Sequence, residues 1–147
     1  MLIFALAAPS APLAQDLGTT PAAAYLRPEW TVERTGAGRA HVVGYLQLTG
    51  DELKSMAVAE DRQQHGIGRA LVEHAVRIWR HEGFRTVRVA TATASIDNLR
   101  FYQRLGFRML EIERDAFTEA EGYATGMVID GIPLRDRVWL TLDLQRI

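Results

Sequence analysis

The sequence predicts an α/β (α+β) fold in which helices pack on a mixed sheet. Two amphipathic segments, at 69–82 and 95–107, have the apolar spacing of helices, and alternating strand-like segments precede, separate and follow them. Of the 147 residues, 48% are apolar and 24% are charged, a balance typical of globular proteins. This length favours a single domain over 1–147 that buries a sizeable core.

The first third of the chain contains mostly strand signals. We expect a first strand near 2–8, followed by an irregular segment over 9–29 that is rich in Ala and Pro and contains weak helix at most. Three more strands are predicted, the first two joined by a Gly-rich turn and the third following Gly50 and Asp51. Their sequences are EWTVER, AHVVGYLQLTG and ELKSMAV.

The helix predicted at 69–82 has the clearest signal, because a wide apolar stripe runs along it and Gly83 then provides a helix stop. A second helix follows the strand TVRVATAT, with Ser95 or Asp97 as its N-cap and a similar stop at Gly106. The stripe of the first helix consists of Ile67, Leu71, Ala75 and Ile78, and its outward charges are Arg69, Glu73, Arg77 and Arg80.

Two late strands, FRMLEIE and RVWLTLDL, complete the predicted sheet. The segment 114–136 lies between them. It is long enough to be either a functional loop or a small hairpin that turns at Asp130 and Gly131.

Composition excludes several classes of function. Seventeen basic and eighteen acidic side chains leave a net charge of -1, so neither nucleic acid nor a membrane is an expected partner. The chain has no cysteine, which rules out disulfides, thiolate metal sites and a cysteine nucleophile. The apolar N-terminus lacks the basic region of a signal peptide, so we expect a cytoplasmic protein.

Glycines open the first helix, in the segment QQHGIGR at 63–69. The N-terminus of a helix attracts anions through its unpaired N–H groups, and glycine allows a phosphate to approach the backbone closely. The spacing matches neither the dinucleotide-binding fingerprint nor a P-loop. The alternative interpretation is an ordinary turn.

The second helix has Asn98 and Tyr102 four residues apart, so both project from one face. An amide can hydrogen-bond another amide, and a phenol can deliver a proton to a leaving group. The alternative is a solvent-exposed Asn98 beside a half-buried Tyr102.

Together these residues resemble the GCN5-related N-acetyltransferase (GNAT) family. SMAVAEDRQQHGIGRALVEHA is similar to the family's strand, Gln/Arg-x-x-Gly-x-Gly loop and helix, and SIDNLRFYQRLGFRML is similar to its Asn…Tyr…Gly-Phe segment. The resemblance is strong over 42–113 and poor over 1–29, where the family normally has two helices between its first two strands. It implies a mixed, mostly antiparallel central sheet flanked by helices and splayed between the fourth and fifth strands, here ELKSMAV and TVRVATAT.

The resemblance also implies an acetyl-CoA site. Asn98 would contact the pantetheine amide, and Tyr102 would protonate the departing thiolate. The backbone of one strand would pair with the pantetheine arm and polarise the thioester carbonyl, through Met56, Ala57 and Val58. The glycine loop would hold the pyrophosphate, through Gln63, Gln64, His65, Gly66, Ile67, Gly68 and Arg69.

Some members of that family have a glutamate base in the register of Glu52, and this residue is our candidate for accepting the proton of the amine. Strict strand alternation predicts Glu52, Lys54 and Met56 on one face, opposite Leu53, Ser55 and Ala57. An edge carboxylate facing solvent is the alternative, and Asp51 is a weaker candidate for the base.

No metal site is predicted, because His74 and His81 lie two turns apart on a polar helix face and His41 and His65 are isolated. The basic cluster of Arg77, Arg80, Arg85 and Arg88 is interpreted as a solvated surface, from which one Arg could reach the CoA ribose phosphate.

The resemblance implies direct transfer of an acetyl group from acetyl-CoA to a primary amine of a small-molecule or peptide acceptor. Two alternatives stay open: a non-catalytic acyl-CoA-binding or regulatory GNAT-like domain, and a phosphate-binding domain for another nucleotide. The acceptor is not predicted, although the acidic and aromatic segment 114–136 would suit a cationic amine. A homodimer also stays open.

Overall fold

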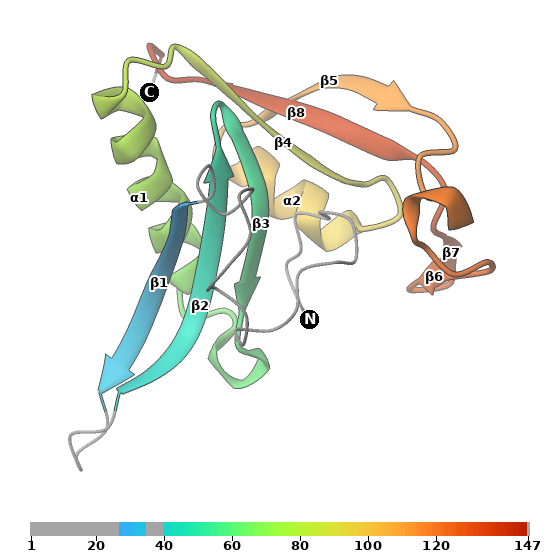
Figure 1. The fold of residues 1–147 in the computed structure, drawn as a ribbon, viewed down its shortest axis with the longest axis horizontal. Helices are drawn as coiled ribbons and strands as arrows, with labels where there is room; N and C mark the ends of the chain where they lie inside the picture. Colours follow the sequence, from blue (N-terminus) through green and yellow to red (C-terminus); the bar gives the residue numbers. More distant parts are fainter. Residues whose placement is uncertain (1–26, 35–39, 147) are drawn as a thin grey trace.

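The computed structural model describes residues 27–34 and 40–146 (Figure 1). The predicted first strand, the irregular segment after it and the Gly-rich turn lie largely or wholly outside the described residues. The elements follow in the order β1 (Arg27–Arg34), β2 (Ala40–Thr49), β3 (Glu52–Val58), η2 (Glu60–Arg62), α1 (Ile67–His81), β4 (Thr86–Ala92), α2 (Ile96–Arg104), β5 (Arg108–Glu113), η3 (Glu119–Glu121), β6 (Val128–Ile129), β7 (Ile132–Pro133) and β8 (Arg137–Asp143).

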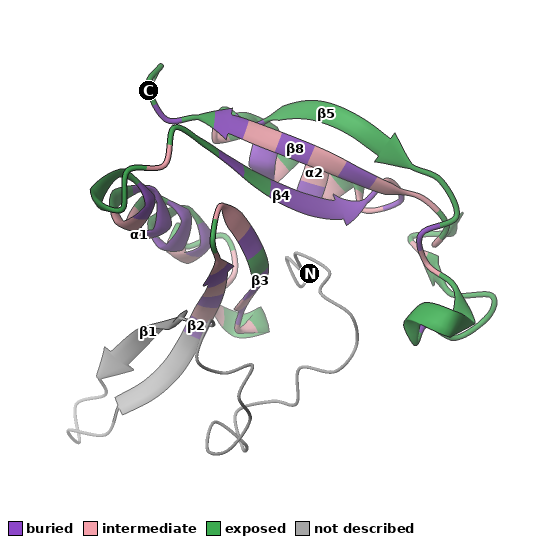
Figure 2. Cartoon of the chain, turned by 45° about the horizontal axis from the view of Figure 1, so that its top comes forward, coloured by how far each residue is buried: buried purple, intermediate pink, exposed green. Residues whose placement is uncertain are grey.

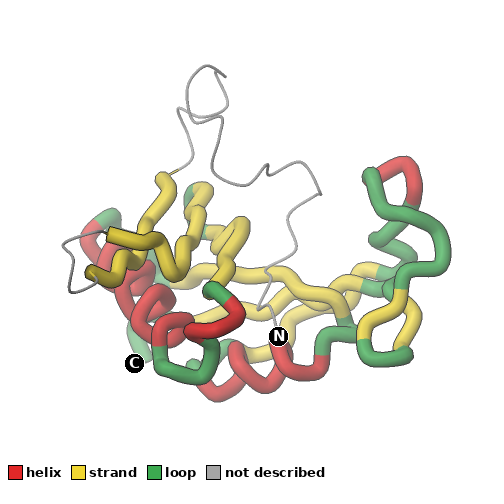
Figure 3. The backbone as a smooth tube through the Cα atoms, turned by 90° about the horizontal axis from the view of Figure 1, so that it is seen from below, coloured by secondary structure: helices red, strands yellow, loops and turns green. Residues whose placement is uncertain are grey.

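A six-stranded sheet in the order β1-β2-β3-β4-β8-β5 forms the centre of the molecule. The pairs within β1-β2-β3 and within β4-β8-β5 are antiparallel, whereas β3 and β4 are parallel. The prediction of a mixed, mostly antiparallel sheet is therefore confirmed. Figure 3 shows both α-helices on the same side of this sheet.

The sheet is split between β3 and β4. These strands pair only at Glu52 with Arg88 and at Leu53 with Val89, and beyond this short contact they diverge (Figure 1). The splay therefore lies between ELKSMAV and TVRVATAT, as expected. It leaves two three-stranded halves that meet at one end and separate at the other.

A β-bulge interrupts β3. Ser55 pairs with Gln47 of β2, but Leu53 pairs with the next residue, Leu48, so Lys54 is an extra residue without a partner in β2. A bulge bends its strand and reverses the alternation of side chains beyond it.

The face predicted for Met56 is consequently wrong. Strict alternation placed it with Glu52, but the bulge moves it to the face of Leu53, where both side chains are buried in the core. Glu52 instead shares a face with Ser55 and Ala57, the face that turns away from α1. Sequence periodicity could not reveal the extra residue.

α1 covers the first half of the sheet with the predicted apolar stripe (Figure 2). Trp79 is fully buried, and its indole Nε1 donates a hydrogen bond of 2.8 Å to the carbonyl of Gly50 in the β2–β3 turn. At the other end of the helix, Gly44 of β2 lets α1 pack closely, since a Cβ there would lie 3.2 Å from side-chain atoms of both Ile67 and Leu71. The helix is thus fixed to the sheet at both ends.

α2 packs on the second half of the sheet. Ser95 occupies its N-cap position, which settles the choice between Ser95 and Asp97. Tyr102 and Phe107 are buried and contact each other edge to face, with ring centroids 5.6 Å apart. The core is continuous across the two halves of the sheet, and β4 and β8 contribute Val87, Val89, Val138, Leu140 and Leu142.

The segment 114–136 contains the small hairpin that the sequence offered as one of two interpretations. β6 and β7 pair around Asp130 and Gly131, whose φ angles are 49° and 79°. Two consecutive positive φ values are typical of the two-residue turn whose backbone matches the right-handed twist of the paired strands. This hairpin lies beyond the end of β5, inside a longer irregular segment (Figure 1).

None of the helices in the described part of the chain has the length and apolar character that crossing a bilayer requires.

Candidate functional site

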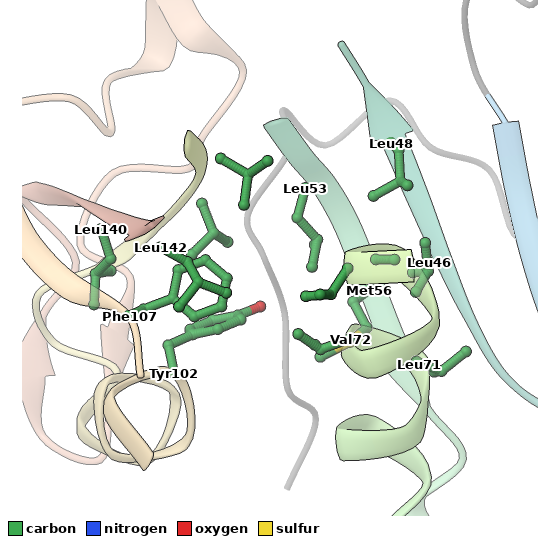
Figure 4. Close-up of a cluster of buried hydrophobic side chains, with 14 of the residues drawn as sticks. Leu46, Leu48, Leu53, Met56, Leu71, Val72, Tyr102, Phe107, Leu140 and Leu142 are labelled. Atoms are coloured by element: carbon green, nitrogen blue, oxygen red, sulfur yellow. The ribbon is translucent and has the colours of Figure 1, made fainter. Parts of the chain in front are cut away.

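Tyr102 places a polar group inside the apolar core. The side chain is fully buried, and no hydrogen-bond partner for its hydroxyl is found among the described residues. Figure 4 shows the hydroxyl pointing from the α2 half of the cluster toward the half that contains Met56 and Val72. Burial raises the pKa of Tyr102 above the ordinary tyrosine value of 10.0, so the phenol stays protonated.

Asn98 lies one helical turn before Tyr102 and is also buried, with 2% of its surface exposed. Its side-chain Nδ2 donates a hydrogen bond of 3.1 Å to Thr91 Oγ1 on β4. The alternative interpretation, an exposed Asn98 beside a half-buried Tyr102, is therefore wrong. Both residues face the interior between α2 and the split sheet.

The glycine loop has the backbone geometry of an anion site. Gly66 is the N-cap of α1, with a φ of 79°, and Gln64 also has a positive φ of 62°. The first helical hydrogen bond runs from Ala70 N to Gly66 O at 3.0 Å, so the amides of Ile67, Gly68 and Arg69 precede it. These amides have no acceptor within the helix and add to its positive N-terminal dipole.

Side chains fasten this loop to the end of β3. Gln63 Nε2 donates to the carbonyl of Val58 at 3.2 Å, and His65 Nδ1 lies 2.8 Å from the carbonyl of Gln63. Arg69 points outward and forms an exposed ion pair of 2.8 Å with Glu73. The loop therefore has a defined position relative to β3, as a binding loop requires.

The segment Met56, Ala57 and Val58 forms the β3 side of the split. One edge of this segment pairs with β2, and the other faces the split, because pairing with β4 ends at Leu53. Among the described strands none pairs with this second edge, so strand pairing leaves it open to an extended ligand, although the Val58 carbonyl already accepts a hydrogen bond from Gln63.

Glu52 lies at the closed end of the split, at the start of β3. Only 14% of its side chain is exposed, and its carboxylate lies 3.4 Å from Lys54 Nζ and 3.9 Å from Arg88 Nη2. The expectation of an edge carboxylate facing solvent is therefore wrong: Glu52 is largely covered and lies between two cations. Asp51 is more exposed and lies 3.6 Å from Arg88 Nε.

The face of the sheet opposite the helices has a network that sequence analysis missed. Arg88 lies over the ring of Trp139, 4.9 Å from its centroid, and Trp139 Nε1 donates to Glu113 at 3.3 Å. Glu113 also pairs with Arg137 at 3.0 Å, and the Arg137 guanidinium lies 5.2 Å from the centroid of Phe117. This network extends from the closed end of the split to the segment 114–136.

A shallow groove runs between α1 and α2 on the helical side of the sheet. Its volume is about 390 Å³, and arginines surround an apolar floor. Arg77 and Arg80, two members of the predicted basic cluster, line it together with Arg69 and Arg104. Within residues 27–34 and 40–146, no group of three or more His, Cys, Asp or Glu side chains is arranged to hold a metal ion.

Buried Tyr102 should make stability depend on pH at the alkaline end. Above pH 10 the tyrosine of the unfolded chain loses its proton while the folded protein keeps it, so the free energy of unfolding falls as pH rises. Tyr102→Phe should reduce this slope by about 1.4 kcal/mol per pH unit. Urea unfolding at several pH values below and above 10 gives the free energy of unfolding of both proteins. If this free energy fell equally steeply with pH in the wild type and in Tyr102→Phe, the prediction would be contradicted.

The fold and the site define a class of α/β domain, in which a split sheet separates a helix that begins after glycines from a helix with a buried Asn–Tyr pair. A family model described as an acetyltransferase (GNAT) domain matches residues 30–109, more than half of the chain. The chain belongs to the GNAT family, a family of acetyltransferases.

Known proteins agree with this assignment. The uncharacterized N-acetyltransferase YvbK of Bacillus subtilis is 37% identical over 93 residues, and the match spans 63% of this chain and 59% of YvbK. An acetyltransferase of B. subtilis solved in complex with CoA has a TM-score of 0.66 and 31% identity, covering 76% of this chain and 74% of that one. A GNAT family acetyltransferase from Elizabethkingia anophelis with acetyl-CoA bound has a TM-score of 0.65 and 27% identity, and the match covers 70% of this chain and 69% of that one.

Proposed function

We propose that this protein transfers an acetyl group from acetyl-CoA directly to a primary amine. The observation that carries the proposal is the Tyr102 hydroxyl, which is fully buried, lacks a partner among the described residues and points across the split. A buried hydroxyl without a partner costs stability, so its presence suggests that a ligand satisfies it. The acetyl-CoA and CoA complexes of the two similar structures support the choice of ligand.

We infer that the donor would contact the described backbone in two places. The pyrophosphate would lie on the amides of the loop 63–69, and the pantetheine arm would pair with the free edge of Met56, Ala57 and Val58. One of these β3 amides would polarise the thioester carbonyl. The buried Asn98 amide would hydrogen-bond the pantetheine, and the arginine-lined groove offers charges for the remaining phosphate.

The chemistry requires two proton transfers. The neutral amine attacks the thioester carbonyl, and collapse of the tetrahedral intermediate breaks the C–S bond and expels the CoA thiolate. Tyr102 donates its proton to this thiolate, and burial keeps the phenol protonated for that step. Glu52 accepts the proton that the amine loses, directly or through one water.

The acceptor would approach from the face opposite the helices. Glu52 lies on that face, and the network from Arg88 to Phe117 extends along the same face to the segment 114–136. The ring faces of Trp139 and Phe117 are already covered by Arg88 and Arg137. Attraction for a cationic amine, from a small molecule or a peptide, would therefore come from the carboxylates of Glu52 and of the segment 114–136 before the amine is deprotonated.

Two measurements test the proposal. CoA should raise the melting temperature of the protein, whereas ATP and NAD should not, because only a bound ligand stabilises the native state by mass action. Release of free thiol from acetyl-CoA should then depend on added amine across a panel of acceptors. Stabilisation by ATP or NAD instead of CoA would overturn the donor assignment, and CoA binding without amine-dependent release would favour a non-catalytic binding domain.

Glu52→Gln should lower turnover by about tenfold, since a neutral amide cannot accept the proton of the amine. We expect a smaller effect than at Tyr102, because the amine also loses its proton to solvent as pH rises. Turnover should be measured at several pH values with one acceptor, together with the Kd for acetyl-CoA, which should not change. A variant whose whole pH–rate profile overlays that of the wild type would remove Glu52 from the mechanism.

A further inference from the structure

The candidate base is held in place by the neighbouring strand. Glu52 and Arg88 are directly opposite each other in the short parallel contact between β3 and β4. The Glu52 carboxylate lies 3.9 Å from Arg88 Nη2, and its other oxygen lies 3.4 Å from Lys54 Nζ. With 14% of its side chain exposed, Glu52 depends on these cations for compensation of its charge.

Arg88 is itself restrained on three sides. Its backbone N–H donates to the carbonyl of Asp51 at 2.8 Å, its Nε lies 3.6 Å from the Asp51 carboxylate, and its guanidinium lies over the Trp139 ring at 4.9 Å. A planar guanidinium stacked on an aromatic ring loses less freedom per contact than a lysine ammonium would. Arg88 therefore has a defined direction even though nearly half of its side chain is exposed.

We propose that Arg88, stacked on Trp139, is a positioning residue that orients the Glu52 carboxylate toward the acceptor amine. The proposal rests on the proposed function, with Glu52 as the base. Arg88 contacts neither the glycine loop nor the Met56–Val58 edge in the described structure, so it acts on the acceptor side and not on the donor. Small displacements of a catalytic group cost rate without unfolding the protein.

The first test compares Arg88→Met with Arg88→Lys. Arg88→Met should lower kcat roughly three- to tenfold and leave the Kd for acetyl-CoA close to that of the wild type. The melting temperature should fall only slightly, because Lys54 still compensates part of the Glu52 charge. Arg88→Lys should restore part of the loss, because it keeps the charge but not the planar stack. Arg146→Met, which removes a more exposed ion pair of 3.3 Å with Asp143, controls for the loss of a surface arginine and should leave kcat unchanged.

Trp139 provides a second pair of variants. Trp139→Leu removes the ring beneath Arg88 and should lower kcat in the same direction, whereas Trp139→Phe keeps a ring face and should lower it less. Equal kcat values for the two variants would overturn the role of the stack.

A double variant separates this inference from the proposed function. If Arg88 acts through Glu52, Arg88→Met should have no further effect on kcat in the Glu52→Gln background. Multiplying effects would mean that Arg88 acts independently and would overturn the inference, as would an unchanged kcat in Arg88→Met alone. By contrast, a wild-type protein without amine-dependent thiol release would contradict the proposed function itself.

Discussion

Tyr102→Phe is expected to lower turnover roughly 10²–10⁴-fold while leaving the Kd for acetyl-CoA nearly unchanged. The variant keeps the ring and its edge-to-face contacts with Phe101 and Phe107, and loses only the proton donor for the departing thiolate. Turnover is measured by thiol release at saturating acetyl-CoA, and the Kd by calorimetry.

Stability provides the internal control for this variant. The Tyr102 hydroxyl has no partner in the described part of the chain, so its removal breaks no hydrogen bond there and relieves the cost of burying a polar group. We therefore expect the melting temperature of the ligand-free variant to equal or exceed that of the wild type. An unchanged turnover number would show that water or another group protonates the thiolate, or that this protonation is not rate-limiting.

Gly66→Val is expected to weaken CoA binding roughly 10- to 100-fold. A β-branched residue at a φ of 79° is strained by about 1–3 kcal/mol, and a free loop that relaxes this strain would have to restore it in order to bind the phosphates. If the loop keeps its shape, a valine side chain stands where the phosphates would approach. If the loop relaxes, the amides of Ile67 and Gly68 move away from the ligand. Calorimetric titration with CoA measures either outcome.

Gly83→Val is the matched control for this variant. Gly83 follows the other end of α1, has a φ of 85° and, like Gly66, has open space where a Cβ would be added. The two variants should therefore lose similar amounts of stability, whereas only Gly66→Val should lose affinity for CoA. Equal affinities for CoA in the two folded variants would show that the loop does not bind the pyrophosphate.

Local patterns predicted the parts of the fold and site that depend on nearby residues. The stripe of α1, the stop at Gly83 and the turn at Asp130 and Gly131 are determined within a few positions of the chain, and the structure contains all three. The glycines before α1 were identified for the same reason, since a helix begins with unpaired amides whatever surrounds it.

Features that depend on distant strands could not be predicted in this way. Met56 lies on the core face because β3 has one residue more than the stretch of β2 with which it pairs. The sequence of β3 alone does not show this extra residue. Arg88 was interpreted as part of a solvated cluster, because its contacts with Glu52 and Trp139 depend on the registers of two different neighbouring strands. The burial of Asn98 likewise depends on how α2 packs against β4.

The extra residue in β3 also affects how this strand should be aligned with those of relatives. A homologue that lacks the residue equivalent to Lys54 would need a one-residue gap to keep Glu52 and Met56 matched at the same time. Without that gap, an alignment anchored at Glu52 would compare a core side chain with one from the opposite face, and apparent substitutions at Met56 or Val58 would reflect a shift of register. Substitution patterns along this strand are therefore meaningful only when each side of the bulge is aligned separately.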